Sequence, residues 1–461
     1  MVFSSTLFLF LFLPLVLLVY YNPLCKGRLF KNIFLFLASL GFYAWGEPVF
    51  VFLLLLSVLV TWFLGIWIEK TKHKKLLIVI GTMYHVTLLF IFKYLSFLMG
   101  QMGLLTEGSV IGKITLPIGI SFFSFQLMSY LFDVYYGTVK AQKSVICVGL
   151  YVSLFSQLIA GPIVRYQQIE DEIWNRAESK ADFTAGMERF IFGLGKKVLI
   201  SNYVAQIADN VFNGSPDRAV MTAWIGALAY SLQIYFDFSG YSDMAIGLGR
   251  MFGFHFEENF NYPYTATSVT DFWRRWHISL SSWFRDYVYI PLGGNRVSKK
   301  KWIRNLFVVW ALTGIWHGAN WTFLVWGLFY FLLLLLEKLT GFDKKLGVFS
   351  RVYTLVAVML AWVVFRAENL RAALQYIGTM FGVGSSGFSD SVFVSYLDSG
   401  KWVISVAILL SMPIYPKLKA KIKDGSLFGD LCESVLLLLI FVLSLVVVVG
   451  TTYNPFIYFN F

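Results

Sequence analysis

Long apolar runs alternate with short polar segments along most of the chain. Residues 48–68 contain no charged side chain, and similar runs cover residues 5–23, 318–336 and 434–450. A helix needs about 20 consecutive apolar residues to cross the hydrocarbon core of a bilayer. The pattern therefore predicts an all-α polytopic membrane protein with about eleven membrane-spanning helices.

The composition agrees with this interpretation. Hydrophobic residues make up 58% of the chain and charged residues only 14%, whereas soluble domains contain about 25% charged residues. No soluble domain or linker is evident, so we expect a single transmembrane domain, 1–461. Within it we expect peripheral helices in roughly 1–110, a catalytic core in roughly 111–340 and C-terminal helices in roughly 341–461.

The net charge of +12 is explained by membrane topology rather than by binding of nucleic acid. Lys and Arg gather in the cytoplasmic loops of membrane proteins, and the basic segments 70–75 and 417–423 are expected there. The three cysteines are far apart in sequence, so no metal site is expected. We predict a multi-pass protein of the cytoplasmic (inner) membrane, surrounded by membrane lipid.

Several segments depart from a simple spanning pattern. Gly161 and Pro162 interrupt an apolar run, and such a break is tolerated where the backbone is buried in protein or lines a cavity. The apolar run 305–316 has only twelve residues, which predicts a tilted, buried or re-entrant piece. The charged segment 165–182 predicts an amphipathic helix at the membrane interface. The Gly-rich segment that ends at Lys197 predicts a turn.

Polar chemistry is concentrated in residues 271–321, between two long apolar stretches. This window holds eight Arg or Lys residues and two of the five histidines. Ionisable groups are costly at membrane depth, so the cluster is a functional-site hypothesis.

The first histidine of the window, His277, follows a Trp-Arg-Arg-Trp motif. If this piece is helical, Trp273 and His277 share a face. Arg274 and Arg275 can bind phosphate or carboxylate groups through paired hydrogen bonds. In the alternative interpretation, these arginines and Trp276 anchor the chain at the membrane interface.

The same region is predicted to attract an anionic acyl donor. Residues 274–304 contain eight basic residues and one acidic residue. A surface with this charge favours the approach of a CoA thioester or of an acidic carrier protein.

The second histidine, His317, lies between the short run 305–316 and the long run that follows it. An imidazole pKa near 6.5 suits removal of the proton from a hydroxyl that attacks a thioester carbonyl. Gly314 and Gly318 allow another segment to approach closely, and the Asn320 amide can donate or accept a hydrogen bond. In the alternative interpretation, His317 is a satisfied core residue.

Two carboxylates, Asp237 and Asp243, fall within an otherwise apolar run. A charge at this depth faces a partner or a water-filled cavity. The sequence leaves open whether each forms an ion pair with an arginine that follows or lines a site. No nucleophile elbow and no His-Glu-x-x-His motif occurs in the chain.

These residues resemble the membrane-bound O-acyltransferase family, and within it the AlgI-like alginate O-acetylation branch. The resemblance covers nearly the whole chain, and it is carried by the motifs Tyr235-Phe-Asp-Phe-Ser-Gly-Tyr-Ser-Asp243, Trp273-Arg-Arg-Trp-His277, Tyr289-Ile-Pro-Leu-Gly-Gly-Asn-Arg296, Gly314-Ile-Trp-His317-Gly, Trp362-Val-Val-Phe-Arg366 and Asn454-Pro-Phe-Ile-Tyr-Phe-Asn-Phe461. Teichoic-acid D-alanyl transferases share part of this core. The segment 289–296 and the long C-terminal extension are more similar to the alginate branch.

The resemblance implies a helical bundle with re-entrant and interfacial helices around a central chamber. It also implies that His317 is the catalytic histidine and that His277 is a second motif residue across the chamber. The other candidates for binding of substrate or donor are Asp237, Arg274, Arg275, Trp276, Trp316 and Asn320.

We therefore expect an O-acyltransferase that moves an acetyl group across the membrane for O-acetylation of an exported polysaccharide. The expected donor is acetyl-CoA or another acyl thioester, with no permanently bound cofactor. The resemblance implies an extracytoplasmic SGNH-type acetyltransferase as partner. The alternatives are D-alanyl transfer to teichoic acid and a membrane transporter, since broken helices and buried charges also fit a transporter.

Overall fold

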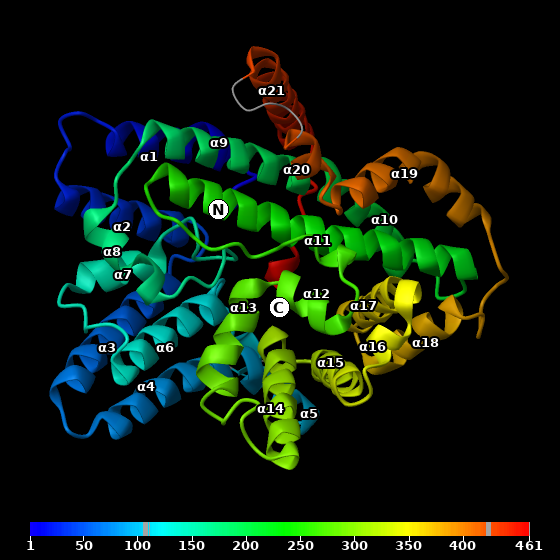
Figure 1. Cartoon of the computed structure of the whole chain (residues 1–461), viewed down its shortest axis with the longest axis horizontal. Helices are drawn as coiled ribbons and strands as arrows, with labels where there is room; N and C mark the ends of the chain where they lie inside the picture. The colour runs from blue at the N-terminus through cyan, green and yellow to red at the C-terminus, as the bar shows by residue number, and fades with distance from the viewer. Residues whose placement is uncertain (105–108, 110, 421–425, 461) are drawn as a thin grey trace. The chain divides into compact units, whose positions relative to one another are not determined.

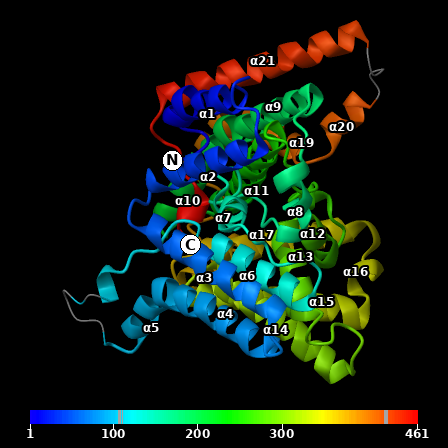
Figure 2. The same ribbon diagram turned by 90° about the vertical axis from the view of Figure 1, so that its left-hand side faces the viewer.

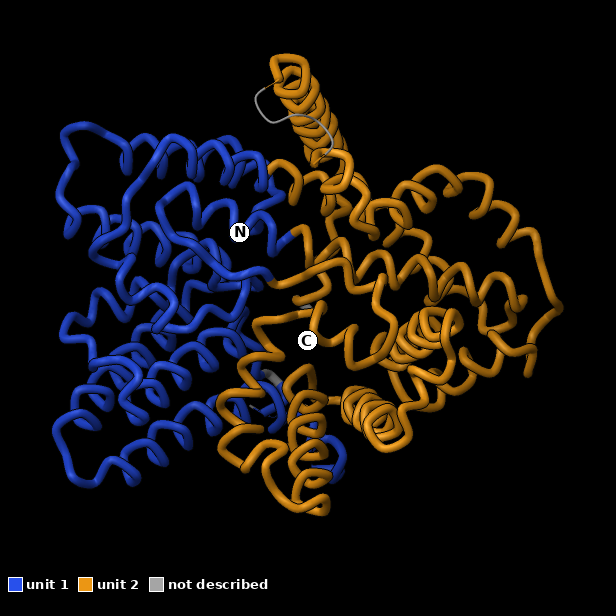
Figure 3. Tube along the Cα trace, viewed as in Figure 1, with its two compact units in different colours: residues 1–190, 241–258 blue, residues 191–240, 259–461 orange. Residues whose placement is uncertain are grey.

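The fold is helical, as the sequence predicts. A computed structural model describes residues 1–104, 109, 111–420 and 426–460 (Figure 1), and this described part contains no β-strand. It forms two compact units (Figure 3): residues 1–190 with 241–258, and residues 191–240 with 259–461. The chain passes between the units three times, within α9 (Lys180–Gly195), within α11 (Val220–Met251) and between residues 258 and 259.

The first unit is built mainly from antiparallel helices of moderate length. Its π- and 3-10 segments are η1 (Phe8–Phe12), η2 (Phe90–Tyr94) and η3 (Ile111–Lys113). Besides parts of α9 and α11, its helices are α1 (Leu13–Tyr20), α2 (Arg28–Ala44), α3 (Phe50–Lys70), α4 (Lys74–Leu89), α5 (Leu95–Gln101), α6 (Ile120–Tyr136), α7 (Val145–Ser153) and α8 (Tyr166–Asn175). Helices α3, α4 and α6 pack together as a layer (Figure 2).

The second unit carries both histidines of the polar window. Its helices include α10 (Asn202–Asn213), α12 (Val269–Arg275), α13 (Ile278–Phe284), α14 (Lys299–His317), α15 (Trp321–Thr340), α16 (Phe342–Lys345), α17 (Ser350–Arg366), α18 (Leu370–Met380), α19 (Ser391–Leu410), α20 (Ile414–Lys419) and α21 (Leu427–Gly450). Its π- and 3-10 segments are η4 (Lys196–Ser201), η5 (Pro263–Thr265), η6 (Arg285–Tyr289), η7 (Gly347–Phe349) and η8 (Ile457–Asn460).

Six helices in the described part are long and apolar enough to cross a membrane. They are Phe50–Lys70, Lys74–Gln101, Trp321–Thr340, Gly347–Arg366, Ser391–Leu410 and Leu427–Gly450. The chain is a multi-pass membrane protein, and the expected total of about eleven spans stays a prediction.

The predicted interruption near Gly161 and Pro162 is present and begins earlier than the sequence suggests. Helix α7 ends at Ser153, and residues 154–164 are not helical. The Tyr151 hydroxyl donates a 2.9 Å hydrogen bond to the Val164 carbonyl across this segment. The irregular backbone is buried within protein, which is the condition for such a break in a membrane protein.

One prediction about local structure is wrong. The segment that ends at Lys197 is not a turn, because α9 continues directly into the π-helix η4. The run 305–316 is part of the 19-residue helix α14, because the basic residues before it are also helical. Its tilted, buried or re-entrant course stays a prediction.

Helices α14 and α15 form a close hairpin that positions His317 (Figure 1). A Cβ at Gly314 would lie 2.5 Å from the Phe323 carbonyl oxygen, and one at Gly327 would overlap the Trp310 carbonyl oxygen. The absence of side chains at these glycines lets the two backbones touch, as in many membrane helix pairs.

Candidate active site

His277 occupies an unusual backbone conformation at a break between two helices. The Ser268 hydroxyl caps the start of α12 by accepting from the Asp271 amide at 3.0 Å, and α12 ends at Arg275. His277 has φ 45° and lies in the left-handed region. Non-glycine residues in this region are uncommon and gather at functional sites. The prediction that Trp273 and His277 share one helical face is therefore wrong.

Both nitrogens of the His277 imidazole have polar partners. Nδ1 lies 3.2 Å from Asn259 Oδ1, and Nε2 lies 2.8 Å from the Tyr458 hydroxyl. An amide oxygen only accepts, so Nδ1 carries the proton and Nε2 accepts from Tyr458.

Tyr458 reaches His277 because the C-terminal tail enters the second unit and docks on a buried ion pair. Lys197 and Asp237 form this pair at 2.6 Å. The Ile457 amide donates to the Asp237 carboxylate at 2.9 Å, and the Lys197 ammonium donates to the Pro455 carbonyl. The ring of Tyr458 stacks on Phe238 at 4.5 Å. Tyr458 is thus held by the backbone contacts of the residues before it and by the stacking of its own ring.

A second charged cluster holds the tail where it leaves α21. Asp209 accepts hydrogen bonds from the Tyr453 hydroxyl and from Arg366, the latter at 2.6 Å. The Asn202 amide donates to the Asn454 side chain at 3.2 Å. The tail is therefore held at two successive points between residues 453 and 458.

The two buried carboxylates form ion pairs, but not with arginines that follow them in sequence. Asp237 pairs with Lys197, and Asp243 pairs with Arg189 at 2.9 Å within the first unit. Both partners precede the carboxylates. The Asp237 carboxylate therefore has two roles, because it neutralises Lys197 and also accepts the hydrogen bond that holds the tail.

His317 is the last residue of α14 and is 6% exposed. Its ring lies 5.0, 4.9 and 5.1 Å from the rings of Trp316, Trp326 and Phe365. The Trp316 ring is also 6.3 Å from that of His277. Trp316 therefore neighbours both imidazoles, and both are shielded from lipid by protein.

Two other predicted site residues have clear packing roles. Trp276 is 2% exposed and stacks with Phe272 at 5.5 Å in the aromatic core of the second unit. Asn320 caps α15 by accepting from the Thr322 amide, and it donates to the Glu368 carbonyl at 2.7 Å. Asn320 thereby joins the start of α15 to the segment after α17.

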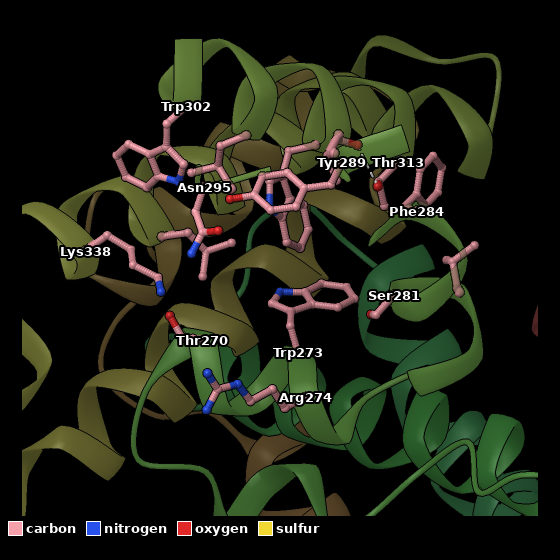
Figure 4. Close-up of a pocket in the computed structure, with 15 residues that line it drawn as sticks. Thr270, Trp273, Arg274, Ser281, Phe284, Tyr289, Asn295, Trp302, Thr313 and Lys338 are labelled. Atoms are coloured by element: carbon pink, nitrogen blue, oxygen red, sulfur yellow. Dashed lines mark hydrogen bonds between the residues drawn. The ribbon is translucent and has the colours of Figure 1, made fainter. Parts of the chain in front are cut away.

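The two arginines of the motif differ in their surroundings. Arg275 forms a 3.0 Å ion pair with Asp271 one helical turn earlier. Arg274 is exposed and lines a cavity of about 270 Å³ formed by α12 to α15. Figure 4 shows Lys338, Thr270 and Arg274 along one edge of this cavity.

The wall of this cavity also offers a buried hydrogen-bond donor. The Trp273 indole N–H has no hydrogen-bond partner among the described residues, although the side chain is 8% exposed. A cavity with two cations at one edge and an indole donor suits an anionic ligand that carries a less polar arm.

Sequence reasoning missed Asn259, Tyr458 and Lys197 as site residues. Asn259 is 18 residues before His277, and Tyr458 is 181 residues after it. Helical spacing gives no signal across such separations. One signal in the sequence could have indicated Tyr458. The tail 453–460 follows an apolar span and is rich in Tyr, Asn and Phe, a composition that is typical of a segment packed against protein.

These features define a multi-pass membrane protein in which two buried imidazoles, one of them bonded to a tyrosine hydroxyl, lie in a unit that opens a basic cavity. Residues 37–371 match the membrane-bound O-acyltransferase family. The chain belongs to this family, so it is a membrane enzyme that transfers an acyl group to oxygen.

Individual relatives give finer detail. The chain is 39% identical to the probable alginate O-acetylase AlgI of Pseudomonas putida, over the full length of both proteins. It is 36% identical to a peptidoglycan O-acetyltransferase of Helicobacter pylori, over 83% of this chain and 80% of the relative. A teichoic acid D-alanyltransferase of Bacillus subtilis is 28% identical over 47% of this chain and 58% of the relative. The resemblance to the acetylating branch is confirmed, and the D-alanyl transferases are more distant.

Proposed function

We propose that the chain moves an acetyl group from a cytoplasmic thioester to the outer side of the inner membrane, for O-acetylation of an exported polysaccharide. The observation that carries this proposal is the 2.8 Å hydrogen bond between Nε2 of the buried His277 and the hydroxyl of the half-buried Tyr458. The names of the alginate and peptidoglycan relatives support acetyl as the group and a glycan as the acceptor.

The donor is proposed to bind in the cavity that Arg274 lines. Arg274 and Lys338 would neutralise phosphates of acetyl-CoA or of an acyl carrier. The Trp273 indole can donate to the arm that carries the thioester. Arg275 supports this site indirectly, because its ion pair with Asp271 stabilises α12.

The Tyr458 hydroxyl is proposed to receive the acetyl group first. A hydroxyl bonded to an imidazole that a third group orients is the arrangement of an activated oxygen nucleophile. The Tyr458 oxygen attacks the thioester carbonyl as its proton passes to His277 Nε2. The carbon–sulfur bond then breaks, and the leaving thiolate takes that proton. The product is an acetyl ester on Tyr458, and Asn259 keeps the imidazole in the required tautomer.

His317 is proposed to serve the second half of the reaction. It acts as general base on an acceptor hydroxyl, which attacks the ester and restores Tyr458. Trp316 and the aromatic rings around His317 exclude bulk water that would otherwise hydrolyse the ester. An extracytoplasmic SGNH-type acetyltransferase is the proposed partner that completes the transfer to the glycan.

Acetyl content of the surface glycan tests the proposal. We expect His317→Ala to abolish glycan acetylation while glycan export stays normal. The control is His73→Ala, because His73 is an exposed residue before α4. If His317→Ala blocks export and leaves acetyl transfer intact, the enzyme proposal fails and a transporter is favoured. Purified protein given acetyl and D-alanyl thioesters separately distinguishes the two acyl groups.

A further inference from the structure

The N-terminus of α12 is held by a buried carboxylate from another helix. Glu337 lies on α15 and is 5% exposed. Its Oε1 accepts from the Val269 amide at 2.6 Å. Its Oε2 accepts from the Thr270 amide at 2.9 Å and from the Thr270 hydroxyl at 2.6 Å. The Tyr353 hydroxyl of α17 donates to Oε1 over a longer distance of 3.4 Å. Glu337 therefore joins α12 to α15 and also contacts α17.

These hydrogen bonds complete the start of α12. The first amides of a helix have no partner within the helix. In α12, the Val269 and Thr270 amides are bonded to Glu337. The next amide, of Asp271, donates to the Ser268 hydroxyl at 3.0 Å. Helices shorter than about 12 residues are marginal on their own, so the seven-residue α12 depends on such contacts for its position.

The two helices that Glu337 joins carry the two cations of the proposed donor cavity. Arg274 comes from α12 and Lys338 comes from α15. Thr270, which is bonded to Glu337, lies on the same edge of the cavity as these two cations (Figure 4). Two charges on separate helices bind one anion tightly only if their separation is fixed before the anion arrives.

The charge of Glu337 by itself would act against an anionic donor. Glu337 is the sequence neighbour of Lys338, and a carboxylate there repels the phosphates that Lys338 and Arg274 are proposed to bind. Charge complementarity therefore does not explain this carboxylate. Its hydrogen bonds to the start of α12 do explain it, because they connect the two sides of the cavity edge.

We propose that Glu337 is a positioning residue for the acyl donor. It fixes α12 against α15, and it thereby sets the separation at which Arg274 and Lys338 bind the same donor phosphate. This inference rests on the proposed function, because it concerns the donor side of that reaction. Glu337 acts on the donor only through these two cations.

Binding of 4′-phosphopantetheine and of pantetheine to the purified full-length protein tests the proposal. The two probes differ only in the phosphate, so the ratio of their dissociation constants measures what the phosphate contributes. A variant that is partly unfolded binds both probes less well by the same factor and keeps the ratio. In the wild type, phosphopantetheine should bind at least about tenfold more tightly than pantetheine, through charge-assisted hydrogen bonds.

Two substitutions of Glu337 separate its reach from its charge. Glu337→Gln should reduce the preference for phosphopantetheine at least about fivefold, because the amide nitrogen cannot accept and a contact with α12 is lost. Glu337→Asp keeps the charge but is one methylene shorter, so it should reduce the preference as well. Lys338→Met should reduce the preference strongly in the wild type and much less in Glu337→Gln, because the two cations no longer act together there.

Asp390→Asn is the matched control. Asp390 accepts from the Phe393 amide at 2.8 Å and from the Ala219 amide at 3.2 Å. Like Glu337, it caps one helix and holds a second segment, but it does not line the donor cavity. Its substitution should leave the preference for phosphopantetheine at the wild-type value.

Several results would overturn the proposal. A stronger preference for phosphopantetheine in Glu337→Gln would show that this side chain acts only through its charge. An unchanged preference in Glu337→Gln or in Glu337→Asp, or an equal loss in Asp390→Asn, would remove the positioning role. The same holds for an equal effect of Lys338→Met in the two backgrounds. A wild type without any preference for phosphopantetheine would show that the cavity makes no use of the phosphate.

Acetyl transfer by the wild type separates failure of this inference from failure of the proposed function. If the binding ratios follow the expectation but no thioester supports acetyl transfer, the proposed function is wrong and the positioning of the two cations stands. If the wild type transfers acetyl while Glu337→Gln keeps the wild-type ratio, Glu337 does not position the cations and the proposed function stands.

Discussion

Replacement of Asp237 by Asn tests whether the C-terminal tail positions Tyr458 for His277. Asp237 is 0% exposed and forms a 2.6 Å ion pair with Lys197. Its other oxygen accepts from the Ile457 amide at 2.9 Å, one residue before Tyr458. The substitution keeps the shape of the side chain, removes its charge and turns one acceptor oxygen into an NH2 donor.

The expected energy loss is large because both partners of the ion pair are buried. Loss of one partner from a buried ion pair costs about 3–5 kcal/mol, since the other charge stays without compensation. The Ile457 amide also exchanges a charged acceptor for a neutral one, which costs a further ~1 kcal/mol. A loss of about 3 kcal/mol at the tail alone raises its undocked population more than about 100-fold.

Hydrogen exchange of the tail and acetyl transfer are the two readouts. We expect faster exchange at residues 453–458 in Asp237→Asn and in Lys197→Met, and at least about tenfold slower transfer. The double variant Lys197→Met/Asp237→Leu removes both charges, so it should regain thermal stability without regaining tail protection or activity. Normal exchange and normal transfer in Asp237→Asn would show that the ion pair does not position Tyr458, and the reasoning would be refuted.

Three further outcomes follow from the geometry. Tyr458→Phe keeps the ring on Phe238 but removes the hydroxyl. The rate of acetyl transfer should therefore fall at least about 100-fold while thermal stability changes little, and near-normal turnover would exclude Tyr458 as the nucleophile. Gly314→Ala should separate α14 from α15 and destabilise the protein by about 1–3 kcal/mol, whereas Gly41→Ala in α2, where a Cβ meets open space, should not. Burial opposes ionisation of Glu178, but its hydrogen bonds to Arg28 and Tyr20 prevail and lower its pKa from 4.5 to about 2. Glu178 therefore stabilises the fold above pH 4.5, and this contribution is lost as the pH falls toward 2. The thermal unfolding temperature of Glu178→Gln should depend less on pH in that range than that of the wild type.

The sequence was sufficient for the class of fold and for the choice of the two histidines on which the proposed site is built. Apolar runs identify the spanning helices because the bilayer imposes one length on them, as in Phe50–Lys70. The polar window identifies His277 and His317 because ionisable groups are rare at this depth. These are properties of short segments, and single-chain patterns report them well.

Contacts between residues that are far apart in sequence cannot be predicted from local hydropathy patterns. Lys197 reads as part of a basic turn, yet it is 2% exposed and neutralises Asp237. The helix before His277 stops two residues early because the Ile278 amide bonds to the Asn259 carbonyl at 2.9 Å. A contact between segments overrides local helical preference here. Tyr458 is still more remote, since only the docking of the tail brings it to His277.

The arrangement of α17 explains how the two histidines can serve one reaction. In its last turn, Phe365 packs against His317 and Arg366 forms an ion pair with Asp209. Asp209 also accepts a hydrogen bond from Tyr453 of the tail. The tail then continues to Tyr458 and His277. A shift of this one helix end therefore changes the surroundings of His317 and the anchoring of the tail together. The proposed two-step transfer needs such a connection, because the ester proposed to form beside His277 must meet an acceptor that His317 is proposed to activate.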